Sequence, residues 1–352
     1  MVELFRSLAI ENVQVSEQDI GRGAYAEVKE AKWRGLNCAG KRIHGALCQD
    51  LRTNKVIEGF LEECRVWSSL RHPHIVQFLG LYFERDRPLP MLIMERMDIS
   101  LRFLLERYKK DTLPFYHKIN ILFQVCLALT YLHLNAPPLV HRDLTANNVL
   151  LNLRSLSAKI TDFGMVKVLD LTKAQNLTGI PGAGAYMPPE AFGPQPVYTT
   201  KLDVFSFGIL TLHAVVHEWP DPLAATQYCR GSLRALTEFE RRETYIRMFS
   251  DVEREYLLPV VISCLQNQPE ARPEVCEILT HLEEIRSKPN FAPVSVNLLE
   301  LEDERLQCFV QLQSADERIQ HLERLQHSGS EPCHSTFKVS YCCCYRLSLI
   351  HI

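Results

Sequence analysis

The stretch HRDLTANNVLL at residues 141–151, followed by TDFG at residues 161–164, decides the fold class of this chain. Transfer of a phosphoryl group needs a carboxylate beside the attacking hydroxyl, a second carboxylate on magnesium, and an amide oxygen that completes the metal shell. Asp143, Asp162 and Asn148 have the order and spacing of these three groups. Because a tripeptide such as DFG recurs by chance, the indication comes from the two stretches together.

The segment DIGRGAYAEVKEAKWRGLNCAGKRIH at residues 19–44 predicts a β-hairpin with a glycine-rich first turn, and then a third strand. Gly21, Arg22 and Gly23 lie in this turn. Because glycine lacks a Cβ, the backbone of such a turn can lie close over phosphate oxygens. The turn is therefore expected to bind the phosphates of a nucleotide.

Side chains on and near this hairpin are expected to contact the same nucleotide. Val28 and Ala39 are expected to cover the adenine ring from above, and Lys41 to reach the α- and β-phosphates. The run FLEECRVWSSLRHPHIVQFLG at residues 60–80 contains a helical stretch that carries Glu63. Glu63 is expected to pair with Lys41 and so to position its ammonium group.

From about Val13 to about Arg286 the chain resembles a eukaryotic protein kinase domain. LRHPHIVQFLG at 70–80, DVFSFGIL at 203–210 and CLQNQPEARPEV at 264–275 resemble the tyrosine-kinase-like group. The resemblance implies an α+β bilobal fold, with a five-stranded antiparallel sheet and one helix in a small N-lobe. It also implies a larger helical C-lobe, with ATP and Mg²⁺ between the lobes.

The same resemblance implies the residues around the adenine ring. Met94 falls at the gatekeeper position, and Glu95, Arg96 and Met97 form the hinge, whose backbone is expected to hydrogen-bond adenine. Leu150 is expected to close the adenine pocket from below.

Other matching positions are architectural. Asp203 resembles the aspartate that holds the catalytic loop backbone, and Glu190 and Arg272 resemble an ion pair at the end of the activation segment. The positions where the family stacks side chains between its lobes are occupied by Trp67, Phe78, His141 and Phe163.

Departures from the family pattern bear on the substrate. Thr145 stands where serine/threonine kinases usually have lysine and tyrosine kinases usually have alanine. Ala183 replaces a threonine of serine/threonine kinases, Ala26 replaces the third glycine of the phosphate loop, and Pro188 replaces an alanine. The tyrosine-kinase-like resemblance favours Ser/Thr hydroxyls of protein substrates, and leaves tyrosine or dual specificity open.

Two functional interpretations follow, an active protein kinase in intracellular signalling and a pseudokinase that binds nucleotide or partners as a scaffold. All five residues of the polar constellation are present: Lys41, Glu63, Asp143, Asn148 and Asp162. A scaffold freed from catalysis has no physical reason to keep a base and two metal ligands together, so the sequence favours the enzyme.

Bulk composition is that of an ordinary soluble protein, with 46% hydrophobic and 23% charged residues among 352. The formal charge of -3 gives no general nucleic-acid footprint. No apolar run approaches the roughly 18 residues of a membrane span, and the first residues do not resemble a signal peptide. The twelve cysteines contain no CxxC pair. Reduced thiols and a cytoplasmic location are therefore expected.

The composition changes after the kinase-like region, 13–286. SKPNFAPVSVN predicts a linker at 287–297. Residues 298–327 can be written in heptads, which predicts either a coiled coil that joins identical chains or a partner, or an amphipathic helix docked on the kinase. The tail at 328–352 is expected to be disordered, and membrane contact is expected only if the cysteines at 342–344 are palmitoylated.

Overall fold

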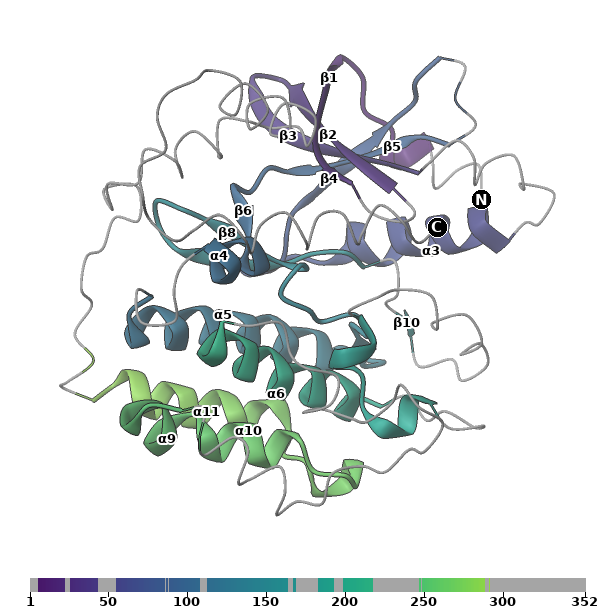
Figure 1. Ribbon diagram of the computed structural model, residues 1–352. Helices are drawn as coiled ribbons and strands as arrows, with labels where there is room; N and C mark the ends of the chain where they lie inside the picture. Colours follow the sequence, from purple (N-terminus) through teal and green to yellow (C-terminus); the bar gives the residue numbers. More distant parts are fainter. Residues whose placement is uncertain are drawn as a thin grey trace, which may run out of the picture.

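The computed structural model has two lobes, with a β-sheet near the start of the chain and helices in the later part (Figure 1). The structure describes residues 6–22, 26–43, 55–85, 87, 89–107, 113–163, 167–168, 183–192, 199–217, 247, 249–288 and 291. This arrangement confirms the predicted α+β bilobal fold.

The N-lobe sheet has five antiparallel strands in the order β1-β2-β3-β5-β4. The strands are β1 (Val13–Arg22), β2 (Ala26–Trp33), β3 (Leu36–Ile43), β4 (Phe78–Tyr82) and β5 (Met91–Glu95). β1 and β4 are its edges, and helix α3 (Lys55–Ser69) lies beneath it (Figure 1). The predicted hairpin, third strand and helix are therefore all present.

Side chains of this sheet alternate between two hydrophobic clusters, because successive residues of a strand point to opposite faces. On β5, Leu92 and Met94 join the main core, which includes α3 residues and continues into the C-lobe. Met91 and Ile93, which alternate with these two residues along β5, join a smaller cluster on the other face of the sheet. This outer-face cluster consists of Val13, Ala31, Cys38, Met91 and Ile93.

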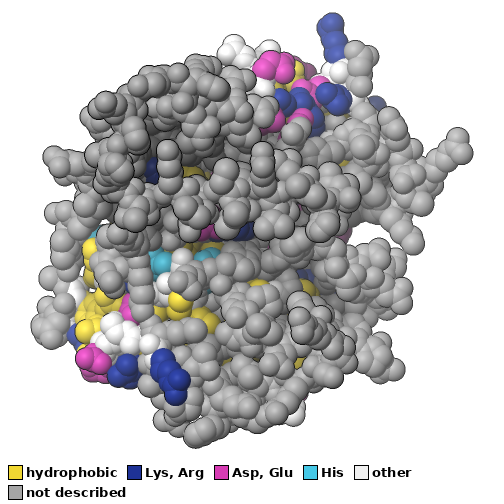
Figure 2. Space-filling view, in the orientation of Figure 1, with side chains coloured by type: hydrophobic (Ala, Val, Ile, Leu, Met, Phe, Trp, Pro, Cys, Tyr) yellow, Lys and Arg dark blue, Asp and Glu magenta, His cyan; other side chains and the backbone are white. Residues whose placement is uncertain are grey.

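Ion pairs link the polar side chains of the same lobe. Arg42 contacts the carboxylates of Glu27 and Glu84, and its Nη1 lies 2.9 Å from Oε1 of Glu27. Nζ of Lys29 lies 2.9 Å from Oδ1 of Asp19. Figure 2 shows basic and acidic side chains beside one another at this end of the molecule. Neighbouring charges of opposite sign partly neutralise each other here.

The C-lobe consists mainly of helices. Those in the described residues are α4 (Leu101–Arg107), α5 (Phe115–His133), α6 (Lys201–Val216), α9 (Asp251–Tyr256), α10 (Leu258–Cys264) and α11 (Val275–Arg286). The short strands are β6 (Ile99–Ser100), β7 (Leu139–Val140), β8 (Val149–Asn152), β9 (Ser157–Ile160) and β10 (Lys167–Val168). Single helical turns of the 3-10 type are η1 (Ala183–Tyr186), η2 (Pro189–Phe192) and η4 (Pro269–Ala271).

Helix α6 is the buried helix on which the C-lobe is assembled. Every residue from Leu202 to Val215 is buried, as expected for a helix that is apolar on all sides. Gly208 allows α10 to approach closely, because a Cβ at this position would lie 2.7 Å from the Cβ of Cys264. The helix therefore provides a fixed base for the loops that pack on it.

The chain after α11 turns back onto the C-lobe. Phe291 is 9% exposed, and its ring centroid lies 5.3 Å from that of Phe115 and 5.6 Å from that of Tyr256. The beginning of the predicted linker is thus anchored by an aromatic contact. The predicted helical segment at 298–327 and the tail at 328–352 lie outside the described residues.

Within the part of the chain that the structure describes, no helix has the length and apolar character needed to cross a membrane. The described cysteines are free thiols; they are Cys38, Cys64, Cys126, Cys264 and Cys276.

Candidate active site

Residues predicted from three separate parts of the sequence meet around Lys41. Its Nζ on β3 lies 2.8 Å from Oε1 of Glu63 on α3 and 3.0 Å from Oδ1 of Asp162, which follows β9. Burial disfavours the ammonium, but the carboxylates of Asp162 and Glu63 outweigh this effect and raise the pKa of Lys41. Lys41 is therefore charged and joins the N-lobe to the C-lobe.

Asp143 and Asn148 are in contact in the catalytic loop, residues 141–148. Nδ2 of Asn148 donates to the backbone oxygen and to Oδ2 of Asp143, both at 2.8 Å. Because its amide nitrogen is used in this way, Asn148 has its side-chain oxygen to offer a metal ion. Burial, and then the charge of Asp162, raise the pKa of Asp143 to about 6. Above that pH the carboxylate is ionised and able to accept a proton.

Asp203 at the start of α6 holds the catalytic loop, as predicted. Its carboxylate accepts hydrogen bonds from the backbone nitrogens of His141 at 2.8 Å and Arg142 at 2.9 Å. A third donor is Nε2 of His133 at the end of α5, 2.9 Å away. The sequence analysis did not single out His133, because nothing in its local pattern indicates a contact with a residue 70 positions later.

A column of rings connects the two lobes. We use the name ring column for Phe78, Trp67, Phe163 and His141. Consecutive ring centroids are 6.3, 5.2 and 5.3 Å apart, within the range of favourable aromatic contacts. The predicted stack is therefore continuous from β4 through α3 to the catalytic loop. Both ring nitrogens of His141 are engaged, with Thr161 O at 3.0 Å and Asp143 N at 3.3 Å, which fits a structural histidine.

The strand register places residues predicted around the nucleotide in two neighbouring rows of the sheet. Gly21 is opposite Val28, and Val28 is opposite Lys41. Ala39 is opposite Met94 on the next strand. The remaining predicted apolar residues, Met97 before β6 and Leu150 on β8, are partly buried and pack against the main core.

The hinge residue Glu95 has its side chain in a separate set of contacts. Its carboxylate lies 2.7 and 2.8 Å from Nζ of Lys159 on β9, and Oε1 accepts from the backbone nitrogen of Gln77 at 2.8 Å. The side chain therefore ties β5 to both lobes, which leaves the predicted adenine contact to the backbone of the hinge.

Of the predicted phosphate loop, Gly21 and Arg22 are described on β1, whereas Gly23 lies outside the described residues.

Tyr186 in η1 connects the activation segment to α6 and the catalytic loop. Its hydroxyl lies 2.6 Å from Nδ1 of His213 and accepts from the backbone nitrogen of Ala146 at 3.4 Å. Burial lowers the pKa of His213 to about 4, so the ring that hydrogen-bonds the Tyr186 hydroxyl is neutral at pH 7. Tyr186 is buried, with 1% exposure. The sequence analysis did not identify its partner His213.

We expect this buried histidine to make the protein less stable in mild acid. Its pKa is lowered from 6.5 to about 4 in the folded state, so between these values the unfolded chain binds the extra proton. The free energy of unfolding therefore falls as the pH decreases through this window, by up to about 1.4 kcal/mol per pH unit for this one group. Urea unfolding at pH 7, 6 and 5 measures the slope.

The matched variant is His213→Gln, whose amide can donate to or accept from the Tyr186 hydroxyl but does not titrate. It should have a shallower dependence of unfolding free energy on pH than the wild type. His281→Gln on α11 serves as the control substitution. Equal slopes for the wild type and His213→Gln would show that His213 is not the group that couples folding to pH.

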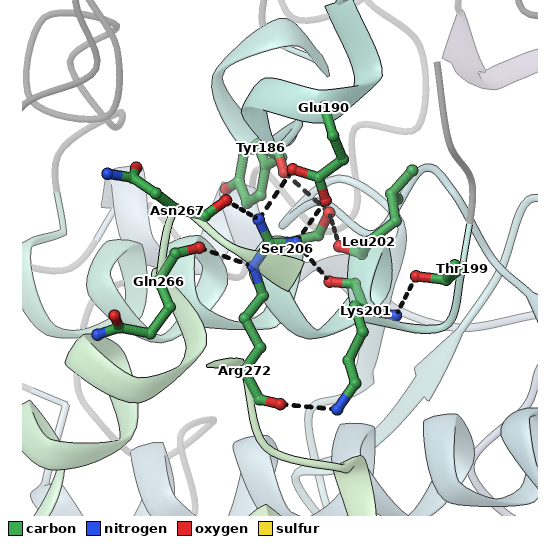
Figure 3. A network of polar contacts seen from close by, with 9 residues as sticks. All are labelled: Tyr186, Glu190, Thr199, Lys201, Leu202, Ser206, Gln266, Asn267 and Arg272. Carbon is green, nitrogen blue, oxygen red and sulfur yellow. Dashed lines mark hydrogen bonds and ion pairs between the residues drawn. The ribbon is translucent and has the colours of Figure 1, made fainter. Parts of the chain in front are cut away.

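Arg272 completes the predicted ion pair with Glu190 (Figure 3). Nη2 of Arg272 donates to Oε2 of Glu190 at 2.9 Å, and Nε donates to the backbone oxygen of Gln266, also at 2.9 Å. Nη1 also donates to the backbone oxygen of Lys201 at 3.1 Å. The network therefore joins η2, the start of α6 and the segment around η4.

Comparison with known proteins agrees with this geometry. Residues 14–282 match the family described as protein tyrosine and serine/threonine kinase. A probable leucine-rich repeat receptor-like protein kinase of Arabidopsis thaliana is 32% identical over 74% of this chain and 23% of its own length. The serine/threonine-protein kinase VIK of the same plant is 32% identical over 76% of this chain and 59% of its own. A seven transmembrane domain-containing tyrosine-protein kinase of Dictyostelium discoideum is 32% identical over 76% of this chain and 37% of its own.

The fold and the polar constellation define a protein kinase domain, and the chain belongs to the protein tyrosine and serine/threonine kinase family. The predicted resemblance is thereby confirmed. The chain covers less than two thirds of the length of each of these three relatives.

Proposed function

We propose that this chain is an ATP-dependent protein kinase that transfers the γ-phosphate of ATP to hydroxyl groups of proteins. The observation that carries the proposal is the contact of Lys41 with both Glu63 and Asp162, together with the continuous ring column. The pseudokinase alternative is less well supported, because the base contacts one candidate metal ligand, Asn148, and lies within electrostatic reach of the other, Asp162. Intracellular signalling is the role that such an activity would serve.

The donor atoms of the site suit magnesium and a triphosphate. Magnesium prefers oxygen ligands, and the carboxylate of Asp162 and the side-chain oxygen of Asn148 are of this kind. When bound, the ion neutralises charge that develops on the phosphates. The φ of +66° at Asp162 is in a region that few residues other than glycine adopt, which is the kind of backbone strain found at functional sites.

The roles of the protein groups follow from their contacts. Asp143 orients the substrate hydroxyl and accepts its proton, while the amide of Asn148 holds the Asp143 carboxylate in place. Lys41 binds the α- and β-phosphates, and Glu63 fixes the position of its ammonium. The backbone of the hinge and of Gly21 and Arg22 would bind adenine and phosphate.

We propose Ser/Thr hydroxyls as the preferred acceptors. The serine/threonine-protein kinase named above supports this choice, but the similar relatives also include a tyrosine-protein kinase and a dual specificity protein kinase of Dictyostelium discoideum. Thr145, the residue that departs from both patterns, is buried in the catalytic loop.

Phosphoamino-acid analysis tests activity and acceptor class together. The full chain is incubated with magnesium and ATP labelled at the γ-position, alone and with a generic protein substrate, and the products are hydrolysed. Label in phosphoserine or phosphothreonine is the expected result. Label in phosphotyrosine alone would contradict the acceptor class, and nucleotide binding with no transfer under any condition would favour the pseudokinase.

Two further proposals rest on the sequence alone. We infer that residues 298–327 mediate self-association in a cytoplasmic protein, and that the cysteines at 342–344 give membrane contact if palmitoylated. Sedimentation of the full chain and of a chain that ends at residue 295 tests the first, and a full chain that is monomeric at tens of micromolar, an order-of-magnitude concentration for a weak coiled coil, would favour a docked helix instead.

A further inference from the structure

A short segment before the family match lies on the edge of the N-lobe sheet. We call residues 8–12 the N-terminal strap. Ala9 forms a parallel β-bridge with Leu81 on β4, and the backbone nitrogen of Ile10 donates to Leu81 O at 2.9 Å. Since β4 is an edge strand, the strap supplies partners to backbone groups that would otherwise face outward.

The strap contacts both hydrophobic clusters of the N-lobe. Leu8 packs against the main core, whereas Ile10 packs against the outer-face cluster. Nε1 of Trp33 on β2 donates to the backbone oxygen of Glu11 at 3.2 Å, and Asn12 then turns the chain into β1 with a φ of +61°. The strap therefore wraps around the β4 edge and is fixed at both ends.

Gly80 on β4 makes room for this segment. A Cβ built on Gly80 would lie 2.5 Å from Cγ2 of Ile10, 3.1 Å from Cγ1 of Ile10, and 3.0 Å from the backbone oxygen of Leu8. Contacts this short are not tolerated without movement of one partner. The absence of a side chain at Gly80 is thus a condition for docking of the strap.

Gly80 also lies next to the ring column. The pairing of β4 with β5 shifts register between Phe78 and Gly80, so the two residues flank a bulge. Phe78 contacts Trp67 on α3, and α3 carries Glu63, the partner of Lys41. A contiguous path of packed groups therefore leads from the strap through β4 to the helix that positions Lys41.

We propose that Ile10 is a positioning residue for phosphoryl transfer. By holding the β4 edge against Gly80, it keeps Phe78 packed on Trp67 and so keeps α3 in the position where Glu63 meets Lys41. The effect on phosphoryl transfer rests on the proposed function. The effect of the strap on the order of α3 does not, because it holds whether or not the chain transfers phosphate.

The experiment compares Ile10→Ala, Gly80→Ala and the double variant in the full chain. Ile10→Ala removes Cγ1 and Cγ2 of Ile10, the side-chain atoms that a Cβ at Gly80 would meet. The double variant should therefore have α3 exchange and a transfer rate no more impaired than those of the more impaired single variant. We expect amide exchange in residues 62–69 of α3 to accelerate in both single variants, and the transfer rate to fall about 5-fold or more, as found for residues coupled through packed networks. The amide of Ile10 itself reports whether the strap is docked.

Val15→Ala is the matched control, because Val15 packs on the same outer-face cluster but lies on β1, at the opposite edge of the sheet. It should leave α3 exchange and the transfer rate within about 2-fold of the wild type, as for a site outside the coupled path. If Gly80→Ala does not fold, α3 exchange and the transfer rate of Ile10→Ala are compared with those of Val15→Ala, and this comparison tests the role of Ile10.

The proposal would be overturned if amide exchange in the Ile10 and Gly80 variants accelerated only in the strap and β4, with α3 exchange and the transfer rate unchanged. The strap would then contribute only local packing. A wild type that transfers no phosphate would refute the proposed function instead. In that case the exchange of α3 still decides the role of the strap.

Discussion

Replacing Asp143 by Asn should lower the rate of phosphoryl transfer by about 100-fold or more, the contribution of a positioned general base. The substitution keeps the size of the side chain and removes its ability to take up a proton. Asp143 is separate from the contacts of Lys41 with Glu63 and Asp162, so the affinity for nucleotide should change little. Transfer of labelled phosphate at saturating ATP, and nucleotide titration, measure the two effects.

Asp162→Asn is the comparison that separates the two carboxylates. It should abolish the magnesium dependence of nucleotide binding, which Asp143→Asn should retain, because only Asp162 offers a carboxylate to the metal in the proposed site. Asp251→Asn, at a side chain that is 98% exposed, serves as the control with wild-type rates. An Asp143→Asn protein that transfers phosphate within about 3-fold of the wild-type rate would rule out general base catalysis by this residue.

Replacing Arg272 by Met should destabilise the folded protein by about 3–5 kcal/mol, the usual cost of removing one partner of a buried ion pair. The Arg272 side chain is 0% exposed. Its loss would leave the Glu190 carboxylate and the backbone oxygens of Lys201 and Gln266 without their donor (Figure 3). Urea unfolding followed by tryptophan fluorescence measures the change.

Arg254→Met is the matched control, since Arg254 is 43% exposed and pairs with Asp251 on the same surface helix. Such pairs contribute about 0–1 kcal/mol. The double variant Arg272→Met with Glu190→Gln should recover part of the lost stability, because the uncompensated charge is then also removed. A loss below about 1 kcal/mol for Arg272→Met would mean that Glu190 is adequately solvated without its partner.

Motifs led to the catalytic constellation because phosphoryl transfer restricts which residue types are usable and how they are spaced along one strand or loop. Asp143 and Asn148 are five residues apart and are in contact, so their proximity follows from local sequence. Lys41 and Asp162 are 121 positions apart. The sequence assigned both residues to the ATP site but did not predict their contact, which the structure shows as a hydrogen bond of 3.0 Å.

Contacts of residues outside these motifs could not be predicted in this way. His133, Lys159 and His213 look like ordinary helix or strand residues, and their partners lie 70, 64 and 27 positions away. Whether a buried histidine has a carboxylate or a hydroxyl beside it depends on how helices and strands pack. The hydrophobic periodicity of a single helix or strand does not reveal which side chains pack against it.

The sequence by itself predicted the bilobal class, through its resemblance to a protein kinase domain, and the strand that carries Lys41, through its local pattern. Reaction chemistry selected the candidate base and the candidate metal ligands. Only the tertiary structure decided that Glu95 binds Lys159 with its side chain, and that Ile10 fills the space left by Gly80. Both depend on close packing between segments far apart in the chain, where a change of one methyl group decides whether two surfaces fit.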